Sequence, residues 1–146
     1  MYKRQEWHLV RAAICGAGAP LDNGRVQGKD YTFPSVPTWT ATGQVSLLPT
    51  VSWDATAVVY RFTGLAPAAR YRLRAIYGVD QARTLRTAVG GLLLHEVQVP
   101  DHAVVEQTSE VPAAAIQNHA LELRITRVAG SNAVVSALEL LSLIHI

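Results

Sequence analysis

Apolar and polar residues alternate most regularly at residues 120–128. One parity of this segment is apolar and the other is polar or charged: Leu121, Leu123 and Ile125 alternate with Glu122, Arg124 and Thr126. A period of two predicts a β-strand with one buried face. A helix would place Leu123 on the wrong side, and β-branched residues favour a strand. The segment is therefore predicted to be a half-buried strand.

Similar alternation predicts further short strands at residues 58–62, 71–77, 92–99, 104–108 and 133–141. A single helical turn is expected within 111–119. Turn-forming residues separate two pairs of these strands, at Gly64–Pro67 and at Gly130–Asn132. This arrangement predicts two antiparallel hairpins, one joining 58–62 to 71–77 and the other joining 120–128 to 133–141.

Several short strands with closely spaced turns predict an all-β fold, an antiparallel β-sandwich, and argue against a parallel α/β architecture. The first quarter of the chain is less regular. Residues 6–15 fit a helix and a strand equally well, and residues 16–37 are rich in loop-forming residues. The expected organisation is an N-terminal extension, linker or remnant of a preceding domain at 1–30, and a sandwich domain at 31–141.

Both ends of the chain resemble translated sequencing adaptors of the kind found on metagenomic fragments. They are left out of the predicted fold, and residues 142–146 are expected to be a non-native tail.

The composition narrows the class of protein. The 146 residues are 49% hydrophobic and 16% charged, which is typical of a globular domain. The net charge is +2 and the basic residues are scattered, so nucleic acid is not an expected partner. No stretch approaches the roughly 18 consecutive apolar residues of a membrane span, so a membrane is not an expected partner either. Cys15 is the sole cysteine and is expected to be a buried, inert thiol, because it has no partner for an internal disulfide.

No catalytic motif is found. The stretch Gly16-Ala17-Gly18 begins like a dinucleotide fingerprint but lacks the third glycine and is followed by Pro20, which predicts a simple turn. No Walker motif and no Gly-x-Ser-x-Gly elbow occurs, and the histidines lack the spacing of a helical zinc pair. The chain is therefore predicted not to be an enzyme.

Three aromatic residues lie ahead of the first regular strand and are candidate ligand contacts: Tyr31, Trp39 and Trp53. Flat aromatic side chains in loops at a sandwich edge can stack on the face of a sugar ring. The alternative for Trp53 is that it fills the core.

Arginines form a second group of candidates. Arg70, Arg72 and Arg74 share one parity of a predicted strand, and Arg83 and Arg86 follow in the next loop or strand. Guanidinium groups of this kind can bind uronic-acid carboxylates through paired hydrogen bonds. The alternative is a solvated face whose arginines pair across strands with residues such as Glu122.

Gly64-Leu65-Ala66-Pro67 followed by Tyr71 resembles the tyrosine corner of β-sandwich domains, including fibronectin type III modules. A fibronectin module would have about one strand left after that tyrosine, whereas several predicted strands follow Tyr71 here. Residues 31–141 more closely resemble the galactose-binding-like jelly roll, an ancillary domain of bacterial glycoside hydrolases and polysaccharide lyases. The segments that carry the resemblance are Trp53-Asp54, Tyr71-Arg72-Leu73-Arg74 with Tyr77, Leu121-Glu122-Leu123-Arg124-Ile125 and Val135-Ser136-Ala137-Leu138-Glu139-Leu140.

That resemblance implies a secreted, non-catalytic carbohydrate-binding module, extracellular or periplasmic, whose partners are a polysaccharide and the catalytic domain of the parent protein. The sugar-binding residues expected are Tyr31, Trp39, Trp53, Arg83 and Arg86. A structural brace or a fibronectin-like interaction domain without a sugar ligand is the alternative.

Domains of this family also commonly hold a structural calcium ion. Asp22, Asp30 and Asp54 are the candidate ligands by position, although they form no Asp-x-Asp-x-Asp cluster. No other cofactor is expected.

Overall fold

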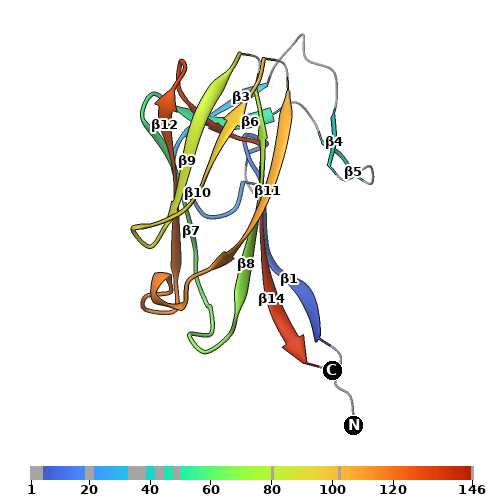
Figure 1. Cartoon of the computed structure of the whole chain (residues 1–146), viewed down its shortest axis with the longest axis vertical. Coiled ribbons are helices and arrows are strands. Elements are labelled where there is room, and N and C mark those ends of the chain that lie inside the picture. Colours follow the sequence, from blue (N-terminus) through green and yellow to red (C-terminus); the bar gives the residue numbers. More distant parts are fainter. Residues whose placement is uncertain are drawn as a thin grey trace.

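The structure, a computed structural model, describes residues 5–18, 22–32, 39–41, 45–47, 50–79, 81–101 and 103–145. Two antiparallel sheets pack face to face, as predicted (Figure 1). The strands of the two main sheets are β1 (Gln5–Ile14), β2 (Arg25–Gln27), β7 (Ala57–Phe62), β8 (Tyr71–Gly78), β9 (Arg83–Val89), β10 (Leu92–Val99), β11 (Val104–Val111), β12 (Leu121–Ala129) and β14 (Ala137–His145). Sheet A has the order β1-β14-β8-β11, and sheet B has the order β10-β9-β12-β7-β2.

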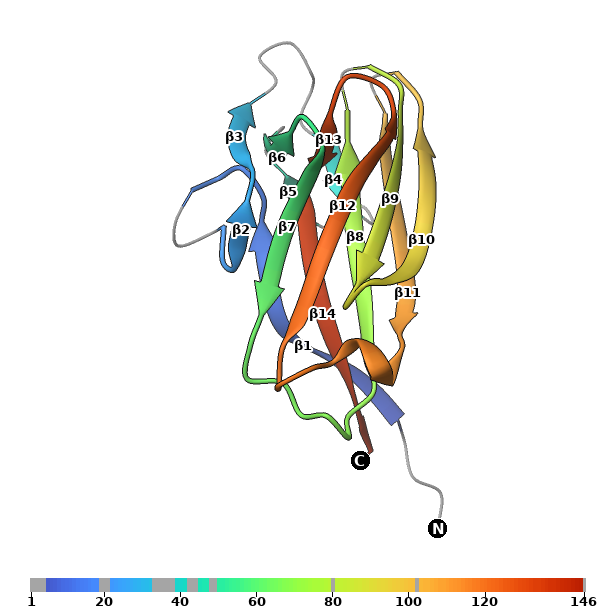
Figure 2. The ribbon, with the colours of Figure 1, turned by 90° about the vertical axis from the view of Figure 1, so that its left-hand side faces the viewer.

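Two smaller sheets complete the described part of the chain. Sheet C has the order β13-β6-β3 and is built from β3 (Lys29–Thr32), β6 (Thr50–Asp54) and β13 (Ala133–Val135). Strands β4 (Trp39–Ala41) and β5 (Val45–Leu47) pair with each other. Figure 2 shows sheet B facing the viewer with sheet A behind it and β3 and β6 at the upper edge. The expected helical turn is the 3-10 helix η1 (Ala113–Ala115).

The core lies between sheets A and B, and it follows the alternation seen in the sequence. Leu121, Leu123 and Ile125 of β12 are fully buried, whereas Glu122 and Arg124 are exposed. Strand β8 alternates in the same way from Tyr71 to Ala75 and is buried on both faces from Ala75 to Gly78. The largest fully buried side chains include Tyr60, Tyr77, Leu73, Leu85, Leu138 and Leu140. Burial of these apolar side chains is the main force that holds the two sheets together.

Both predicted hairpins are wrong in their pairing. Strands β7 and β8 belong to opposite sheets, and so do β12 and β14. The turn after β7 therefore carries the chain from one sheet to the other. The alternating pattern requires only that one face of each strand is buried. Two consecutive strands meet this requirement equally well when they pair in one sheet and when they lie in opposite sheets across the core. Strands β9 and β10 do form a hairpin across Gly90-Gly91.

The segment at Gly64–Tyr71 forms the corner that the sequence motif indicates. The hydroxyl of Tyr71 accepts a hydrogen bond from the backbone N–H of Ala66 at 2.9 Å. Gly64 has φ +70°, a left-handed conformation that suits glycine. The corner thus fixes the connection that crosses between the sheets.

The sandwich uses strands from outside the limits 31–141 expected from the sequence. Strand β1 pairs with β14 from Gln5↔His145 to Ile14↔Ala137, and β2 pairs with β7. Residues 6–14 thus form a strand rather than a helix, and Cys15 begins the following turn. Ala13 of β1 and Cys15, which follows the strand, are both buried. They belong to the hydrophobic core that also contains the inward side chains of sheet B.

Candidate functional site

Sheet C brings two of the three predicted aromatic residues together. Lys29 lies opposite Trp53, and Tyr31 lies opposite Val51. Opposite residues of an antiparallel pair share a face, so Lys29, Tyr31 and Trp53 lie on one face of this sheet. We call these three residues the aromatic surface.

The members of the aromatic surface differ in exposure. Tyr31 on the edge strand β3 is 45% exposed. Trp53 is half-buried and packs against the core, so the core interpretation of this residue holds for part of its ring. The ammonium nitrogen of Lys29 lies 5.3 Å from the centre of the Trp53 ring, within cation–π range. The aromatic surface therefore presents the exposed phenol ring of Tyr31 beside the Lys29 ammonium group, which contacts the Trp53 indole.

Of the other predicted residues, Arg83 and Arg86 lie on β9 and are not part of this surface. Trp39 lies on β4, and its side chain is outside the described residues. Arg83 of β9 is buried, and its Nε donates to Asn132 Oδ1 at 3.0 Å. Arg86, also on β9, is exposed and binds Glu96 Oε1 through Nε at 3.1 Å and Nη2 at 2.9 Å.

Arg70, just before β8, and the β8 residues Arg72 and Arg74 form contacts on the outer face of sheet A. Arg70 pairs with Glu110, and Arg74 pairs with both Glu106 and Glu139. Arg72 stacks over the ring of Trp7 at 4.1 Å.

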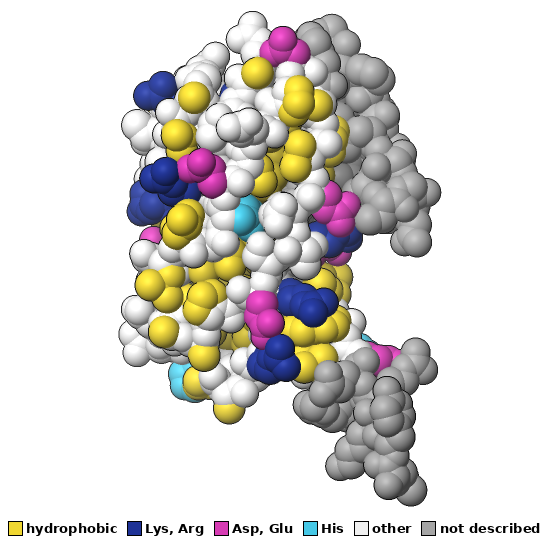
Figure 3. Space-filling view, in the orientation of Figure 1, with side chains coloured by type: hydrophobic (Ala, Val, Ile, Leu, Met, Phe, Trp, Pro, Cys, Tyr) yellow, Lys and Arg dark blue, Asp and Glu magenta, His cyan; other side chains and the backbone are white. Residues whose placement is uncertain are grey.

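The expected kind of pairing is thus present, but Glu122 was the wrong partner because it lies on sheet B. Figure 3 looks onto the edge formed by β10 and β11 and shows dark-blue and magenta side chains side by side on both flanks of it.

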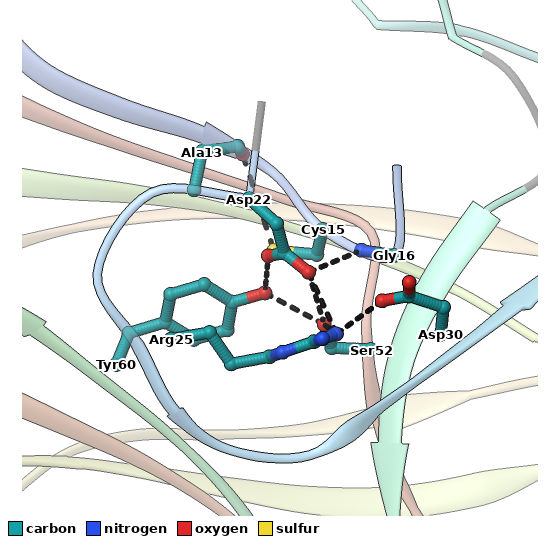
Figure 4. A network of polar contacts seen from close by, with 8 residues as sticks. All are labelled: Ala13, Cys15, Gly16, Asp22, Arg25, Asp30, Ser52 and Tyr60. Carbon is teal, nitrogen blue, oxygen red and sulfur yellow. Dashed lines mark hydrogen bonds and ion pairs between the residues drawn. The ribbon is translucent and has the colours of Figure 1, made fainter. Parts of the chain in front are cut away.

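A buried polar network lies beneath sheet C (Figure 4). Its centre is the Asp22 carboxylate, whose side chain is 3% exposed. Asp22 Oδ2 lies 2.7 Å from Arg25 Nη1 and accepts from Gly16 N–H at 3.2 Å. Asp22 Oδ1 accepts a short hydrogen bond from the Tyr60 hydroxyl. One carboxylate thus joins the loop after β1 to the core strand β7.

Strands β3 and β6 are tied into the same network. Ser52 Oγ lies 2.7 Å from the Tyr60 hydroxyl and 3.3 Å from Asp22 Oδ2. Arg25 Nη1 donates to Ser52 Oγ at 3.1 Å and also pairs with Asp30. Asp30 and Ser52 are opposite each other on the face of sheet C away from the aromatic surface. The network therefore positions the strands that carry Tyr31 and Trp53.

The hydroxyl of Tyr60 and the nearby thiol of Cys15 both stay protonated. Burial raises the pKa of the Tyr60 hydroxyl, so Tyr60 donates to Asp22 rather than ionising. Burial also raises the pKa of the Cys15 thiol, and Cys15 is fully buried. A protonated, buried thiol is neither a nucleophile nor a metal ligand, which agrees with the inert cysteine expected from the sequence.

The three candidate calcium ligands do not form a calcium site. Arg25 lies between Asp22 and Asp30 and neutralises both carboxylates. Asp54 Oδ1 instead accepts from Thr56 N–H at 3.0 Å and Ala57 N–H at 3.2 Å in a tight turn. These bonds lower the pKa of Asp54, with the bond from Thr56 as the largest cause. Among the described residues, no group of three or more His, Cys, Asp or Glu side chains is placed to hold a metal ion.

Sequence reasoning missed a second polar cluster, at the edge where β10 and β11 meet. His95 Nε2 lies 2.7 Å from the Tyr77 hydroxyl, and His95 Nδ1 lies 3.0 Å from Ser109 Oγ. Tyr77 also forms a short hydrogen bond to Thr87. The cluster links sheet A to sheet B, because Tyr77 and Ser109 belong to sheet A whereas His95 and Thr87 belong to sheet B. Burial lowers the pKa of His95 to about 4.

Stability is expected to fall as the pH is lowered from about 6.5 to about 4. In this window the unfolded chain protonates His95, which has an ordinary pKa of 6.5, whereas the folded protein keeps it neutral with a pKa of about 4. Because the ring is partly exposed, the loss attributable to His95 is about 1–2 kcal/mol.

Urea unfolding at pH 7 and pH 4.5 measures this loss, and His95→Gln is the control. The variant removes the histidine titration and leaves the carboxylates in place, so its stability should fall less over the same interval. Equal losses in the two proteins would contradict the assignment.

Comparison with known proteins gives the fold and no family. Neither a known family model nor a curated protein sequence matches the chain. Among solved structures, a chain in the crystal structure of the plant peptide RALF23 in complex with FER and LLG2 matches at a TM-score of 0.71 and 12% identity, over 94% of this chain and 49% of that chain. The ANX1 ectodomain from Arabidopsis thaliana matches at 0.72 and 8% identity, again over 94% and 49%.

A bacterial enzyme shares the fold as well. The β-glucuronidase of Bacteroides uniformis matches at a TM-score of 0.62 and 12% identity, over 92% of this chain and 18% of that chain. The chain thus spans about half the length of the plant chains and under a fifth of the enzyme. At these identities the likeness shows a common β-sandwich fold. In the described part of the chain, no helix is long and apolar enough to cross a bilayer.

Proposed function

We propose that this chain is a non-catalytic carbohydrate-binding module that serves a polysaccharide-degrading enzyme. The observation that carries the proposal is the aromatic surface, where the exposed Tyr31 ring lies on the same face as Lys29 and Trp53. A sugar ring presents apolar C–H groups on its faces and hydroxyls around its rim. A flat phenol beside an ammonium group matches both parts of such a ligand.

In this proposal each residue has a distinct role. The Tyr31 ring stacks on the sugar face, and the Lys29 ammonium donates hydrogen bonds to the hydroxyls. Trp53 holds Lys29 through the cation–π contact at 5.3 Å and anchors the surface to the core. The Asp22–Arg25 network keeps β3 and β6 in register behind the surface. The site is thereby preorganised, which reduces the entropy lost on binding.

The accessory role is supported by the fold. A sandwich of this kind makes up under a fifth of the B. uniformis β-glucuronidase, a length that leaves room for other domains in that protein. The proposed partners are therefore a polysaccharide and the catalytic domain of a parent enzyme, and the proposed location is extracellular or periplasmic.

Tyr31→Ala is expected to weaken polysaccharide binding about tenfold, because the stacking ring is lost. Affinity electrophoresis on gels containing xylan, β-glucan, galactan, mannan or pectin identifies the ligand, and calorimetry gives the change in Kd. Leu93→Ala is the matched control, since Leu93 is an exposed apolar residue, 62% exposed, on sheet B. Retardation of the wild-type protein by none of these polysaccharides would reject the proposal.

A structural brace is the second candidate, and the outer face of sheet A favours it. Leu9 is 54% exposed and lies opposite Leu141, next to the Trp7–Arg72 stack. An apolar patch of this type fits contact with another protein domain. The same gels separate the two candidates, because a brace would migrate unretarded through every polysaccharide.

A further inference from the structure

Arg61 differs from the other described arginines in having no interaction partner. Each of the others forms a hydrogen bond, an ion pair or a ring contact: Arg11, Arg25, Arg70, Arg72, Arg74, Arg83, Arg86, Arg124 and Arg127. The Arg61 guanidinium has none within the described residues, although the cross-strand neighbour of Arg61 is Glu122. An exposed guanidinium with five unused donors is an open anion site.

Arg61 lines a pocket of about 410 Å³ on sheet B. The polar residues that line this pocket are Arg61, Gln117, Asn118 and Glu122. Apolar walls come from Val26, Ala115 and Ala120, with Gly90 beside them. The volume falls within the range of small-ligand sites, about 300–1,000 Å³.

The rim of the pocket is held rigidly. Asn118 and His119 have φ values of 54° and 60°, and this two-residue turn is closed by backbone hydrogen bonds between Gln117 and Ala120 at 2.9 and 3.0 Å. The turn is tied to the tyrosine corner, because His119 C=O accepts from Leu65 N–H at 2.9 Å. The Asn118 carboxamide is thus carried on a fixed backbone.

The floor is fixed by a close backbone approach. A Cβ atom on Gly90 would lie 2.5 Å from the carbonyl oxygen of Ala115, so only glycine fits there. The pocket is therefore formed before any ligand arrives, and little ordering is needed on binding.

We infer that this pocket binds a hexuronate residue of an acidic glycan, a conclusion that rests on the proposed carbohydrate-binding function and adds a second site to it. Arg61 pairs with the sugar carboxylate, since a guanidinium matches a carboxylate through two parallel hydrogen bonds. The carboxamides of Gln117 and Asn118 both donate to and accept from ring hydroxyls. Glu122 accepts from a hydroxyl, and its own charge is offset by Arg124 at 3.7 Å.

The test uses oligomers of galacturonate, glucuronate and mannuronate, each beside its carboxyl-reduced form, in which –COO⁻ has become –CH₂OH. Calorimetry or NMR titration with the whole chain gives the Kd of each. The wild-type protein should bind at least one acidic oligomer on the order of tenfold more tightly than its reduced form. Arg61→Gln should remove that difference, because glutamine keeps polarity and loses the charge.

Arg86→Gln is the matched control, since Arg86 is also an exposed arginine of sheet B but is paired with Glu96. It should leave the preference for the acidic oligomer unchanged. The inference is overturned if no acidic oligomer binds, if the reduced forms bind equally well, or if Arg61→Gln and wild type have the same Kd.

The two proposals can fail separately. If neutral polysaccharides bind and Tyr31→Ala weakens that binding while the carboxyl group has no effect, the Arg61 site is wrong and the proposed function stands. If neither neutral nor acidic glycans bind, both are wrong. A preference for acidic oligomers that depends on Arg61 and is unaffected by Tyr31→Ala supports the pocket and contradicts the aromatic surface.

Discussion

Asp22→Ala is expected to lower the free energy of unfolding by about 3 kcal/mol, although the residue lies in a loop. The Asp22 side chain is 3% exposed and accepts from Tyr60, Ser52 and Gly16 while it pairs with Arg25. Removing one member of a buried ion pair leaves the other charge and several polar groups without partners, and such losses amount to about 3–5 kcal/mol. The lower end applies because Arg25 keeps Asp30 as a partner.

Asp30→Ala is the control for this prediction, because it removes a carboxylate from the same guanidinium. Asp30 is exposed, with 48% of its side chain accessible, so its ion pair is screened by solvent. Its loss should cost under about 1 kcal/mol. Urea unfolding followed by circular dichroism gives both values, and similar losses in the two variants would show that Asp22 is not the centre of the network.

Gly16→Ala should destabilise the fold by more than about 3 kcal/mol, a loss large enough to leave much of the protein unfolded. Gly16 has φ +80°, and a Cβ atom there would lie 2.0 Å from the carbonyl oxygen of Val51. This contact is with backbone, so no side-chain rotation can relieve it, and β6 would have to move. The shift would also disturb the hydrogen bond from Gly16 N–H to Asp22.

Gly18→Ala separates crowding from backbone conformation. Gly18 has nearly the same φ, +82°, but a Cβ atom there meets nothing within 4 Å. The free energy of unfolding should therefore fall only by the cost of placing alanine in the left-handed backbone conformation, about 1 kcal/mol. Thermal melting of both variants measures the difference in stability. If Gly16→Ala shows no folded signal while Gly18→Ala melts as a folded protein, that outcome also agrees with the prediction. A difference of less than 1 kcal/mol between them would contradict the close approach of the backbones.

Strands β7, β8, β10, β11 and β12 could be predicted from the sequence, but β9, the strands before β7 and the pairing of the strands could not. Alternation in residues such as Leu121 and Leu123 reports that one face is buried, and β12 is buried on that face. The same alternation is satisfied whether the next strand lies beside it or across the core. The turn residues at Gly64–Pro67 were therefore compatible with a hairpin, and the structure instead uses them to cross between sheets.

The candidate site was predictable only in part, for a related reason. Tyr31 and Trp53 could be selected by residue type, and β3 and β6 bring them to one face. Asn132, a partner of buried Arg83, and Ser109, a partner of His95, are distant from those residues in the sequence, and nothing local indicates them. Arg61 carries no motif at all, and only the contacts of the described residues show that its guanidinium has no partner among them.

The order of strands in sheet A has a consequence for synthesis on the ribosome. Strand β14 lies between β1 and β8, yet it follows both in the chain by many residues. A nascent chain that has not yet reached Ala137 therefore exposes the unpaired edges of β1 and β8 together with their apolar faces. We expect the sandwich to close only after β14 emerges from the exit tunnel, so that folding of this domain follows its translation rather than accompanying it.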